Sequence, residues 1–363
     1  MSPNHARVGK KVTIGAVAKH AGVSVGTVSR VLNGYNNITP ENLDKVQEAI
    51  ALMGYQKSRS VETPAPRRRG LRTGTGNIGL AFYDMDVTWT NHPLVSQYTF
   101  GAEQACREKG FHTLVELCGS SDTLPRCVRD RKVDGLLVKT VHAVPGFINQ
   151  LPSDFPVICI GFNNPSASIR QVAADDRGAG WETTEYLWRL GHRRIAFICV
   201  DVSHPMMLAR MHGYEGYLRM QHAFDPARMY AGELSAAKVP VQKGMPPDMT
   251  EALEAVWPEQ GEKPTAIIVS NDWAASSLYE ALAAKGLRVP DDVSVTGFDN
   301  TPRLCDTLRP PLSSYAIPFD GVAYQGACEL FALIERAGKV RQRSIMLIQG
   351  SLFERASVRE PAA

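Results

Sequence analysis

The chain has 363 residues, 44% of them hydrophobic and 21% charged, and this length predicts two or three globular units. No apolar run reaches the roughly 18 residues that span a bilayer, which excludes a membrane-spanning protein. The net charge of +3 is unevenly distributed, because residues 1–72 carry 12 Lys and Arg against 4 Asp and Glu. A basic head that suits an anionic partner therefore precedes a mildly acidic body.

The seven cysteines are scattered without CxxC spacing, and several lie in apolar runs such as VICIGF. This pattern favours buried free thiols in a reducing compartment over a zinc site or a disulfide framework. The polar, basic N-terminus lacks the apolar segment of a secretory signal. We therefore expect a cytoplasmic protein without a metal or another cofactor.

Residues 1–55 predict three short helices, each preceded by a residue that can cap it. Thr13, Ser24 and Thr39 are the caps, and apolar residues then recur at helical spacing. Pro40 suits the first position of the third helix, and Gly54 suits its end. Small residues between the first two helices allow a tight turn, as in a helix-turn-helix.

The second helix carries the residue types that read DNA. Helical spacing places Gly26, Arg30 and Asn33 on the face opposite the apolar positions. Arginine is the most common reader of guanine, while Ser24 and Ser29, with the neighbouring Thr27, are short donors that suit phosphate. The periodicity alone also allows a helical hairpin in a larger core, and the basic charge of the segment favours the DNA-binding alternative.

Residues 56–77 are rich in Pro, Gly and Arg and predict a linker. Short apolar runs then alternate with helical stretches, which predicts an α/β fold of parallel sheets covered by helices. The length suggests two Rossmann-like subdomains with a ligand cleft at the carboxyl ends of the strands. The expected strands are 78–82, 113–118, 134–139, 157–162, 195–200, 266–270, 293–298 and 344–350. The expected helices are 94–109, 178–190, 210–221, 272–285 and 320–337.

The segment VTIGAVAKHAGVSVGTVSRVLNG (12–34) resembles the N-terminal motif of the lactose-repressor (LacI/GalR) family of bacterial transcription regulators. The later segments LGHRRIAFI (190–198), PTAIIVSNDWAA (264–275) and VPDDVSVTGFDN (289–300) resemble the effector-binding core of that family in order and spacing. The resemblance implies a periplasmic-binding-protein type I core. It implies a head at 1–55, a linker at 56–77, a first subdomain of about 78–175 with 301–330, and a second of about 176–300 with 331–363.

In the head, the resemblance implies that Arg30 reads a base and that Val25 and Gly26 hold the two variable positions that set operator preference. In the linker, RRGLRTG (68–74) resembles the end of the family's hinge, which makes Leu71 a candidate wedge in the minor groove. A flexible basic linker remains an equal alternative there. The expected DNA contacts are Thr13, Ser24, Val25, Gly26, Thr27, Ser29, Arg30, Asn33, Asn37, Arg69 and Leu71.

In the core, the resemblance implies an effector pocket whose residue types suit a sugar or sugar derivative, since carboxylate, amide and guanidinium groups bind hydroxyls. Gly161 stands where several sugar-binding members have an acidic residue, and His92 is a candidate lip contact or an ordinary loop residue. The expected effector contacts are Tyr83, Arg210, Leu234, Asn271, Asp299 and Phe319.

These features predict a sequence-specific DNA-binding regulator, most simply a repressor, that a small molecule controls. The expected partners are a pseudo-palindromic double-stranded operator, the effector and a second copy of the chain, with helix 94–109 as the dimer face. A solute-binding or sensor protein with the same core is the alternative. An enzyme is disfavoured, because the chain has no phosphate-binding P-loop, nucleophile elbow or zinc-protease motif.

Overall fold

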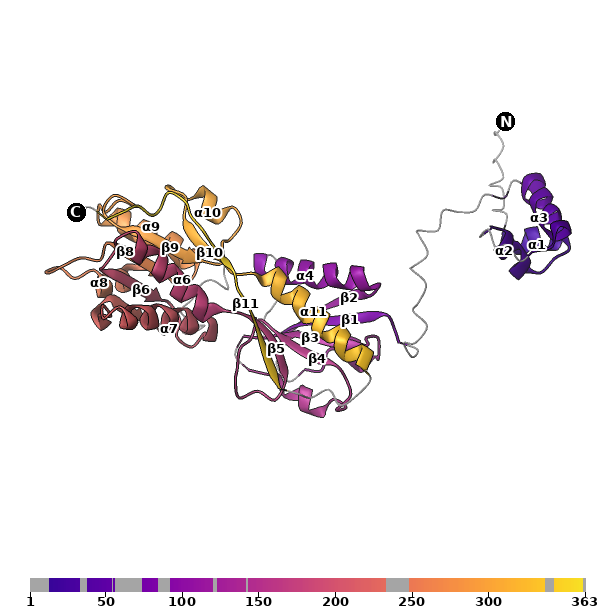
Figure 1. Ribbon diagram of the computed structural model, residues 1–363, viewed down its shortest axis with the longest axis horizontal. Coiled ribbons are helices and arrows are strands. Elements are labelled where there is room, and N and C mark those ends of the chain that lie inside the picture. Colours follow the sequence, from indigo (N-terminus) through magenta and orange to yellow (C-terminus); the bar gives the residue numbers. More distant parts are fainter. Residues whose placement is uncertain are drawn as a thin grey trace, which may run out of the picture. The chain divides into compact units, whose positions relative to one another are not determined.

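The computed structural model describes residues 13–32, 38–53, 55, 74–83, 92–119, 123–141, 143–232, 248–336 and 343–361. The chain divides into two compact units, residues 1–69 and 70–363, which we call the head and the core (Figure 1). Among the residues that the structure describes, no helix is long and apolar enough to cross a membrane. The predicted fold class, a helical head and an α/β core, is confirmed.

The helices of the head are α1 Ile14–Ala21, α2 Val25–Leu32 and α3 Pro40–Met53. The Thr13 hydroxyl caps α1 by accepting a backbone N–H at 3.2 Å, and Gly22 ends the helix with a φ of 64°, where glycine is favoured. Val17, Val28 and Val46, one from each helix, have no exposed surface. These side chains give the head a hydrophobic core of its own, so the alternative of a helical corner in a larger core is wrong.

The core consists of two lobes, each built on a six-stranded sheet (Figure 1). The first lobe comprises β1 Asn77–Tyr83, α4 Pro93–Lys109, β2 His112–Cys118, α5 Arg126–Arg129, β3 Gly135–Lys139, η2 Gly146–Gln150, β4 Val157–Ile160, β5 Arg170–Ala174, α11 Phe319–Arg336 and β11 Ser344–Ile348. The second lobe comprises α6 Asp176–Arg189, β6 Ile195–Cys199, α7 Pro205–Met220, η3 Pro226–Arg228, β7 Met229–Ala231, α8 Thr250–Val256, β8 Ala266–Val269, α9 Asp272–Ala284, β9 Ser294–Phe298, α10 Leu304–Thr307, β10 Ser313–Ala316 and β12 Ser351–Phe353.

Helices cover both faces of each sheet. The strand orders are β11-β5-β4-β3-β1-β2 and β12-β10-β9-β8-β6-β7, and all the pairs are parallel except β10 with β12. In the first lobe α4 and α11 pack on one face, with α5 and η2 on the other. In the second lobe α6 and α7 pack on one face, with α8 and α9 on the other. The parallel strands explain the near-continuous apolar runs in the sequence.

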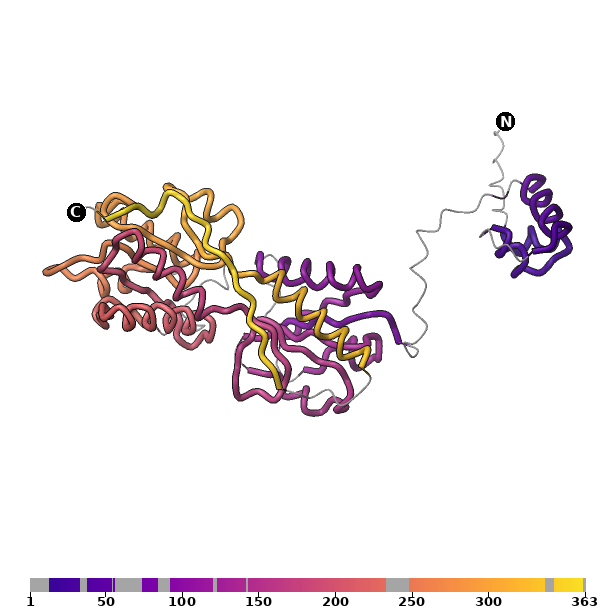
Figure 2. The backbone as a smooth tube through the Cα atoms, viewed as in Figure 1, coloured from indigo at the N-terminus to yellow at the C-terminus, as the bar shows by residue number. Residues whose placement is uncertain are grey.

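Within the described residues the chain passes between the lobes at 174–176, 316–319 and 348–351 (Figure 2). The predicted allotment of the C-terminal segments was therefore wrong. Part of 301–330 belongs to the second lobe, since β10 pairs with β9, and part of 331–363 belongs to the first, since β11 pairs with β5. Strand β10 has the sequence SSYA, and its two serines interrupt the apolar run that would predict a buried strand. Strand β5 was not predicted either. Their partners are distant in the chain, so no local pattern indicated them.

Candidate functional site

The α2 helix has an exposed face suited to a DNA groove. Ser24 caps the helix, because its Oγ accepts the Thr27 N–H at 3.1 Å and lies 2.9 Å from Thr27 Oγ1. Val25 is 50% exposed, and Gly26 and Arg30 are exposed as well. The rigid fork of an arginine matches the edge of guanine, and an apolar side chain suits the methyl group of thymine.

Some of the remaining predicted contacts lie in the described part of the chain and some lie outside it. Thr13 is exposed and Ser29 is half-buried in the described head. The other predicted positions lie outside the described residues: Asn33, Asn37, Arg69 and Leu71 for DNA, and Leu234 for the effector.

In the core, Arg210 holds together the main polar cluster. It lies on the second turn of α7 and is only 3% exposed. Its Nε donates to Asp176 Oδ1 at 2.8 Å, and its Nη1 donates to the carbonyl oxygen of Ser270 at 2.8 Å. Its Nη2 forms an ion pair with Asp299 Oδ1 at 2.9 Å, and its guanidinium lies 5.0 Å from the ring centroid of Phe298. Arg210 thus orients two carboxylates.

The residues around Arg210 meet because each follows a parallel strand of the core. Asp176 begins α6 just after β5, Ser270 follows β8, and Asp299 follows β9. The carboxyl ends of such strands are the usual ligand site of open α/β sheets. Asp176 was not predicted, because β5 was not recognised as a strand. Burial raises the pKa of the Asp176 carboxyl to about 6, although Arg210 acts in the opposite direction.

The loop that carries Asp299 has an uncommon backbone. Asp299, Asn300 and Arg303 have φ values of 97°, 47° and 67°. Non-glycine residues in such conformations each cost about 1–3 kcal/mol, so surrounding contacts must hold them in place. Such backbone strain is typical of ligand sites.

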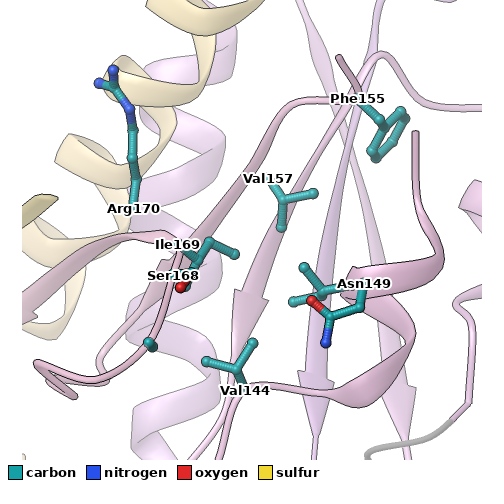
Figure 3. Close-up of a pocket in the computed structure, with 9 residues that line it drawn as sticks. Val144, Asn149, Phe155, Val157, Ser168, Ile169 and Arg170 are labelled. Atoms are coloured by element: carbon teal, nitrogen blue, oxygen red, sulfur yellow. The ribbon is translucent and has the colours of Figure 1, made fainter. Parts of the chain in front are cut away.

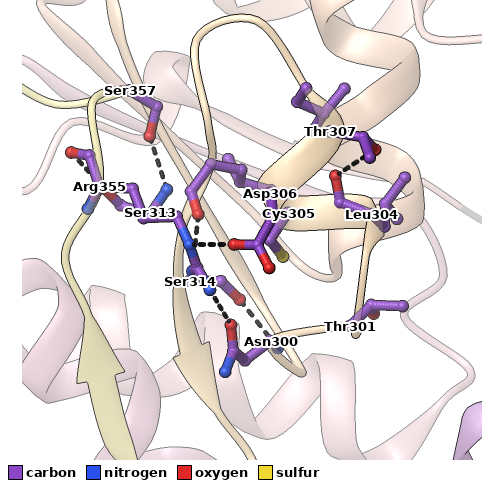
Figure 4. A network of polar contacts seen from close by, with 12 residues as sticks. Asn300, Thr301, Leu304, Cys305, Asp306, Thr307, Ser313, Ser314, Arg355 and Ser357 are labelled. Carbon is purple, nitrogen blue, oxygen red and sulfur yellow. Dashed lines mark hydrogen bonds and ion pairs between the residues drawn. The ribbon is translucent and has the colours of Figure 1, made fainter.

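Two side chains hold this loop in place. Buried Asp272 accepts the Thr301 N–H and the Ser314 hydroxyl, each at 2.6 Å. Arg355, which follows the last strand of the second lobe, donates to Asn300 Oδ1 at 2.8 Å (Figure 4). Burial raises the pKa of the Asp272 carboxyl, and the negative charge of Asp299 adds to this effect. The position of Asp299 is therefore fixed by contacts with residues that are distant in the sequence.

The structure brings Asn271 and Phe319 to the carboxyl ends of strands as well. Asn271 caps α9, because its Oδ1 accepts the Ala274 N–H at 2.8 Å, which leaves its amide nitrogen as the donor for a ligand. Phe319 begins α11 and is 6% exposed. Its ring centroid lies 5.6 Å from that of Tyr98.

Tyr83, by contrast, is placed away from this cluster, and its predicted role is withdrawn. It has no exposed surface, its hydroxyl donates to the carbonyl oxygen of Thr123 at 2.7 Å, and its ring stacks on Phe147 at 5.4 Å. Side chains alternate along a strand. Phe82 faces the side of the sheet that α4 and α11 cover, so Tyr83 faces the other side.

Two residues of α4 face the charges of the second lobe. His92 caps α4 with Nδ1, which accepts the Leu94 N–H at 3.2 Å. Burial lowers the pKa of His92, and the charge of Asp299 opposes this shift. Burial raises the pKa of Tyr98, and the charges of Asp176 and Asp299 raise it further. The polar cluster lies at the junction of the two lobes, because Asp176 stands at the 174–176 connection between them.

A separate pocket of about 220 Å³ lies in the first lobe (Figure 3). Val157 and Arg170, the first residues of β4 and β5, line it, so it opens at the amino ends of the strands. None of the predicted effector contacts within the described residues lines it. The Arg170 guanidinium points away from this pocket (Figure 3) and forms an ion pair with Glu329 at 3.4 Å. The polar cluster at the carboxyl ends is therefore the better candidate for an effector site.

Comparisons with known proteins identify both the head and the core. Residues 13–58 match the family described as bacterial regulatory proteins, lacI family, and residues 184–358 match the periplasmic binding protein-like domain. The HTH-type transcriptional regulator DegA of Bacillus subtilis is 30% identical over 324 residues, which cover 85% of this chain and 87% of DegA. The HTH-type transcriptional repressor PurR of Histophilus somni is 27% identical over 358 residues, which cover 96% of this chain and 99% of PurR.

Solved structures are similar over nearly the full length. A complex of the transcriptional regulator CelR with cellobiose has a TM-score of 0.65 at 25% identity, and the match covers 96% of this chain and 100% of that chain. The lac repressor dimer bound to operator and the anti-inducer ONPF has a TM-score of 0.65 at 23% identity with the same coverage, and it shows the shared fold. With a two-lobed ligand-binding core and a helix-turn-helix head, the chain belongs to the lacI family of bacterial regulatory proteins.

Proposed function

We propose that the protein is a repressor that reads a pseudo-palindromic operator in the bacterial cytoplasm and releases or grips it when a sugar or sugar derivative binds the core. As a lacI-family member, it is a DNA-binding transcriptional regulator with a ligand-binding core. The printed names of its relatives support the finer proposal: PurR is a repressor, and CelR is seen with cellobiose.

The effector role depends on the cluster of Arg210, Asp176 and Asp299. Two carboxylates at the carboxyl ends of parallel strands accept hydroxyl donors well. Asp299 keeps 22% of its side chain exposed, against 7% for Asp176. We therefore assign the direct hydroxyl contact to Asp299 and an orienting role to Arg210.

The effector can control DNA binding by the head because both lobes contribute residues to the proposed effector site. A ligand between the lobes favours the lobe arrangement that it contacts best. If that arrangement changes the spacing of two heads, effector affinity and operator affinity are coupled reciprocally.

We also propose that a homodimer forms through α4 and the neighbouring β2. Phe100 on α4 is 60% exposed, and Val115 and Leu117 on the edge strand β2 are 45% and 37% exposed. A two-fold dimer presents two heads to two half-sites, which explains a pseudo-palindromic operator. Phe100→Glu should convert the dimer to a monomer in light scattering, whereas Phe353→Glu, a change of an exposed phenylalanine in the second lobe, should not.

The central experiment selects operator sequences from random double-stranded DNA with the full chain. Removal of residues 1–72 should abolish selection, and unchanged DNA affinity would contradict the proposed function. A thermal-shift screen of sugars and sugar acids then identifies ligands, which are added to the operator complex. Asp299→Ala should abolish the ligand response and preserve operator selection. If it binds each ligand as the unaltered chain does, the effector site is wrongly placed.

A further inference from the structure

Tyr98 is a buried tyrosine of the first lobe. It lies on α4 and is 1% exposed. Its ring contacts Phe82 edge-on at 6.4 Å and Phe319 at 5.6 Å between centroids. These two aromatic residues lie near the carboxyl end of β1 and at the start of α11. The ring of Tyr98 is therefore fixed by packing.

Gly161 marks where the hydroxyl of Tyr98 lies. Gly161 follows β4 directly and has a φ of 63°, a conformation that side chains other than glycine rarely adopt. A Cβ atom at this position would clash with the Tyr98 hydroxyl. The hydroxyl thus sits at the carboxyl end of β4, in space that a larger residue at 161 would take.

The hydroxyl of Tyr98 lies at the carboxyl end of β4, which pairs with β5, and Asp176 of the polar cluster directly follows β5. The charges of Asp176 and Asp299 also raise the pKa of Tyr98. Behind the ring, the Lys139 ammonium lies 5.5 Å from the ring centroid and donates to the carbonyl oxygen of Thr140 at 2.9 Å. A phenol donates and accepts one hydrogen bond each, so it complements carboxylates that only accept.

The charges around Tyr98 balance. Asp176 and Asp299 contribute two negative charges, and Arg210 and Lys139 contribute two positive charges. Both cations are already held by oxygen atoms of the protein. Among the described residues of this cluster, a charged ligand would therefore meet no surplus of opposite charge, whereas hydroxyl groups could bond to the carboxylates and the phenol.

We propose that Tyr98 is the first lobe's contact to the effector, that Gly161 makes room for it, and that the pair selects an uncharged polyhydroxyl ligand. This assignment depends on the proposed function, because it concerns the same site. In this arrangement the ligand hydroxyls bridge Asp299 on one lobe and Tyr98 on the other.

The test uses the full chain and isothermal titration with neutral aldopentoses, aldohexoses and hexitols, together with the aldonic acid of each sugar. Tyr98→Phe retains the ring packing and should weaken binding of the best neutral ligand roughly five- to tenfold, the effect of one lost hydrogen bond. The matched control is Tyr217→Phe, a buried tyrosine of α7 that packs on Trp181 and Trp188. It should bind like the unaltered chain.

Two further measurements separate a ligand contact from a packing effect. A deoxy-sugar that lacks the bridging hydroxyl should bind the unaltered chain less tightly than its parent sugar does. The two sugars should bind Tyr98→Phe with equal affinity. Gly161→Ala should weaken ligand binding by the same factor as Tyr98→Phe. The double variant should bind no more weakly than either single variant, because each change removes the same contact between the Tyr98 hydroxyl and the ligand. Additive losses would contradict the pairing of Tyr98 with Gly161.

Other outcomes overturn the inference in distinguishable ways. If Tyr98→Phe and the unaltered chain bind every ligand with equal affinity, Tyr98 does not contact the effector. The proposed function still holds in that case, provided that a ligand controls operator binding. If the unaltered chain binds no neutral member of the panel, or binds only aldonic acids, the ligand class is wrong. Loss of operator selection by the unaltered chain would instead contradict the proposed function itself.

Discussion

The head and the core expose their functional side chains in opposite ways. In the head, Val25 and Arg30 lie on the outside of a short helix, and the hydrophobic core beneath them is made by other residues. In the core, Arg210 and Asp176 are buried and bonded to each other. Changes in the reading face should therefore alter DNA affinity alone, whereas changes in the effector cluster should alter ligand affinity and stability together.

The largest expected effect is from Arg210→Ala, which leaves the buried Asp176 and the partly buried Asp299 without their cation. The free energy of unfolding of the core should fall by about 3–5 kcal/mol. Urea denaturation followed by tryptophan fluorescence measures this, because all five tryptophans belong to residues 70–363. Arg219→Ala is the control, since Arg219 lies on the same helix with 62% of its side chain exposed. It should change stability by less than about 0.5 kcal/mol, and equal losses would contradict the contrast between buried and exposed arginines.

The second prediction concerns pH. Because the pKa of Asp176 is raised to about 6 in the folded protein from 3.8, this carboxyl stabilises the fold below pH 4. That contribution disappears as the pH rises through 6. The difference in unfolding free energy between the unaltered chain and Asp176→Asn should therefore fall by about 2 kcal/mol from pH 4 to pH 7. Urea titrations at several pH values measure the difference, and a constant difference would show that burial does not control this group.

The third prediction concerns the head. Arg30→Ala should weaken binding to the selected operator by about 1–3 kcal/mol and relax preference at one base pair. The melting of the head should not change, because Arg30 is exposed. Fluorescence anisotropy and calorimetry provide the two readouts. Lys19→Ala, a change in an exposed cation on α1, should leave base preference as it was. A shifted head melting temperature in Arg30→Ala would contradict the separation of reading from stability.

The smallest expected effect is at Gly26. A Cβ atom there meets the Ser24 hydroxyl at 3.6 Å, an ordinary contact. Since glycine is less favourable than alanine in a helix and Gly26 lies in the first turn of α2, Gly26→Ala should stabilise the head by less than about 0.5 kcal/mol. Calorimetry of the full chain measures this shift. A destabilised head would show that Gly26 is required for folding and not only for groove contact.

The sequence predicted the head closely because its signals are local. Thr13, Ser24 and Pro40 stand at or next to the helix starts that the structure shows, and Met53 ends α3 just before Gly54. Caps and helical spacing depend on residues within a few positions of one another. For the same reason, most of the strands of the core were predicted, and the alternation of strands and helices gave the correct fold class.

The effector cluster was predicted only in part, because its geometry depends on distant segments. Arg210 and Asp299 were expected as ligand contacts, but their mutual ion pair follows from the placement of α7 beside β9. Asp176 was missed with β5, and Tyr98 was missed because helix spacing does not show what its ring touches. The strand was expected to end at residue 82, but β1 includes Tyr83, whose side chain packs on the face of the sheet opposite α4 and α11.

Three connections between the lobes in the described part of the core limit how the lobes can move. Two bodies joined by one flexible tether can twist, slide and separate, but short tethers at 174–176, 316–319 and 348–351 remove most of these freedoms. What remains is rotation about an axis through the connections, so a small closing at the ligand becomes a larger displacement at the far end of each lobe. The pairing of β10 with β9 and of β11 with β5, which local sequence patterns did not predict, thus creates the connections that restrict the lobes to this rotation.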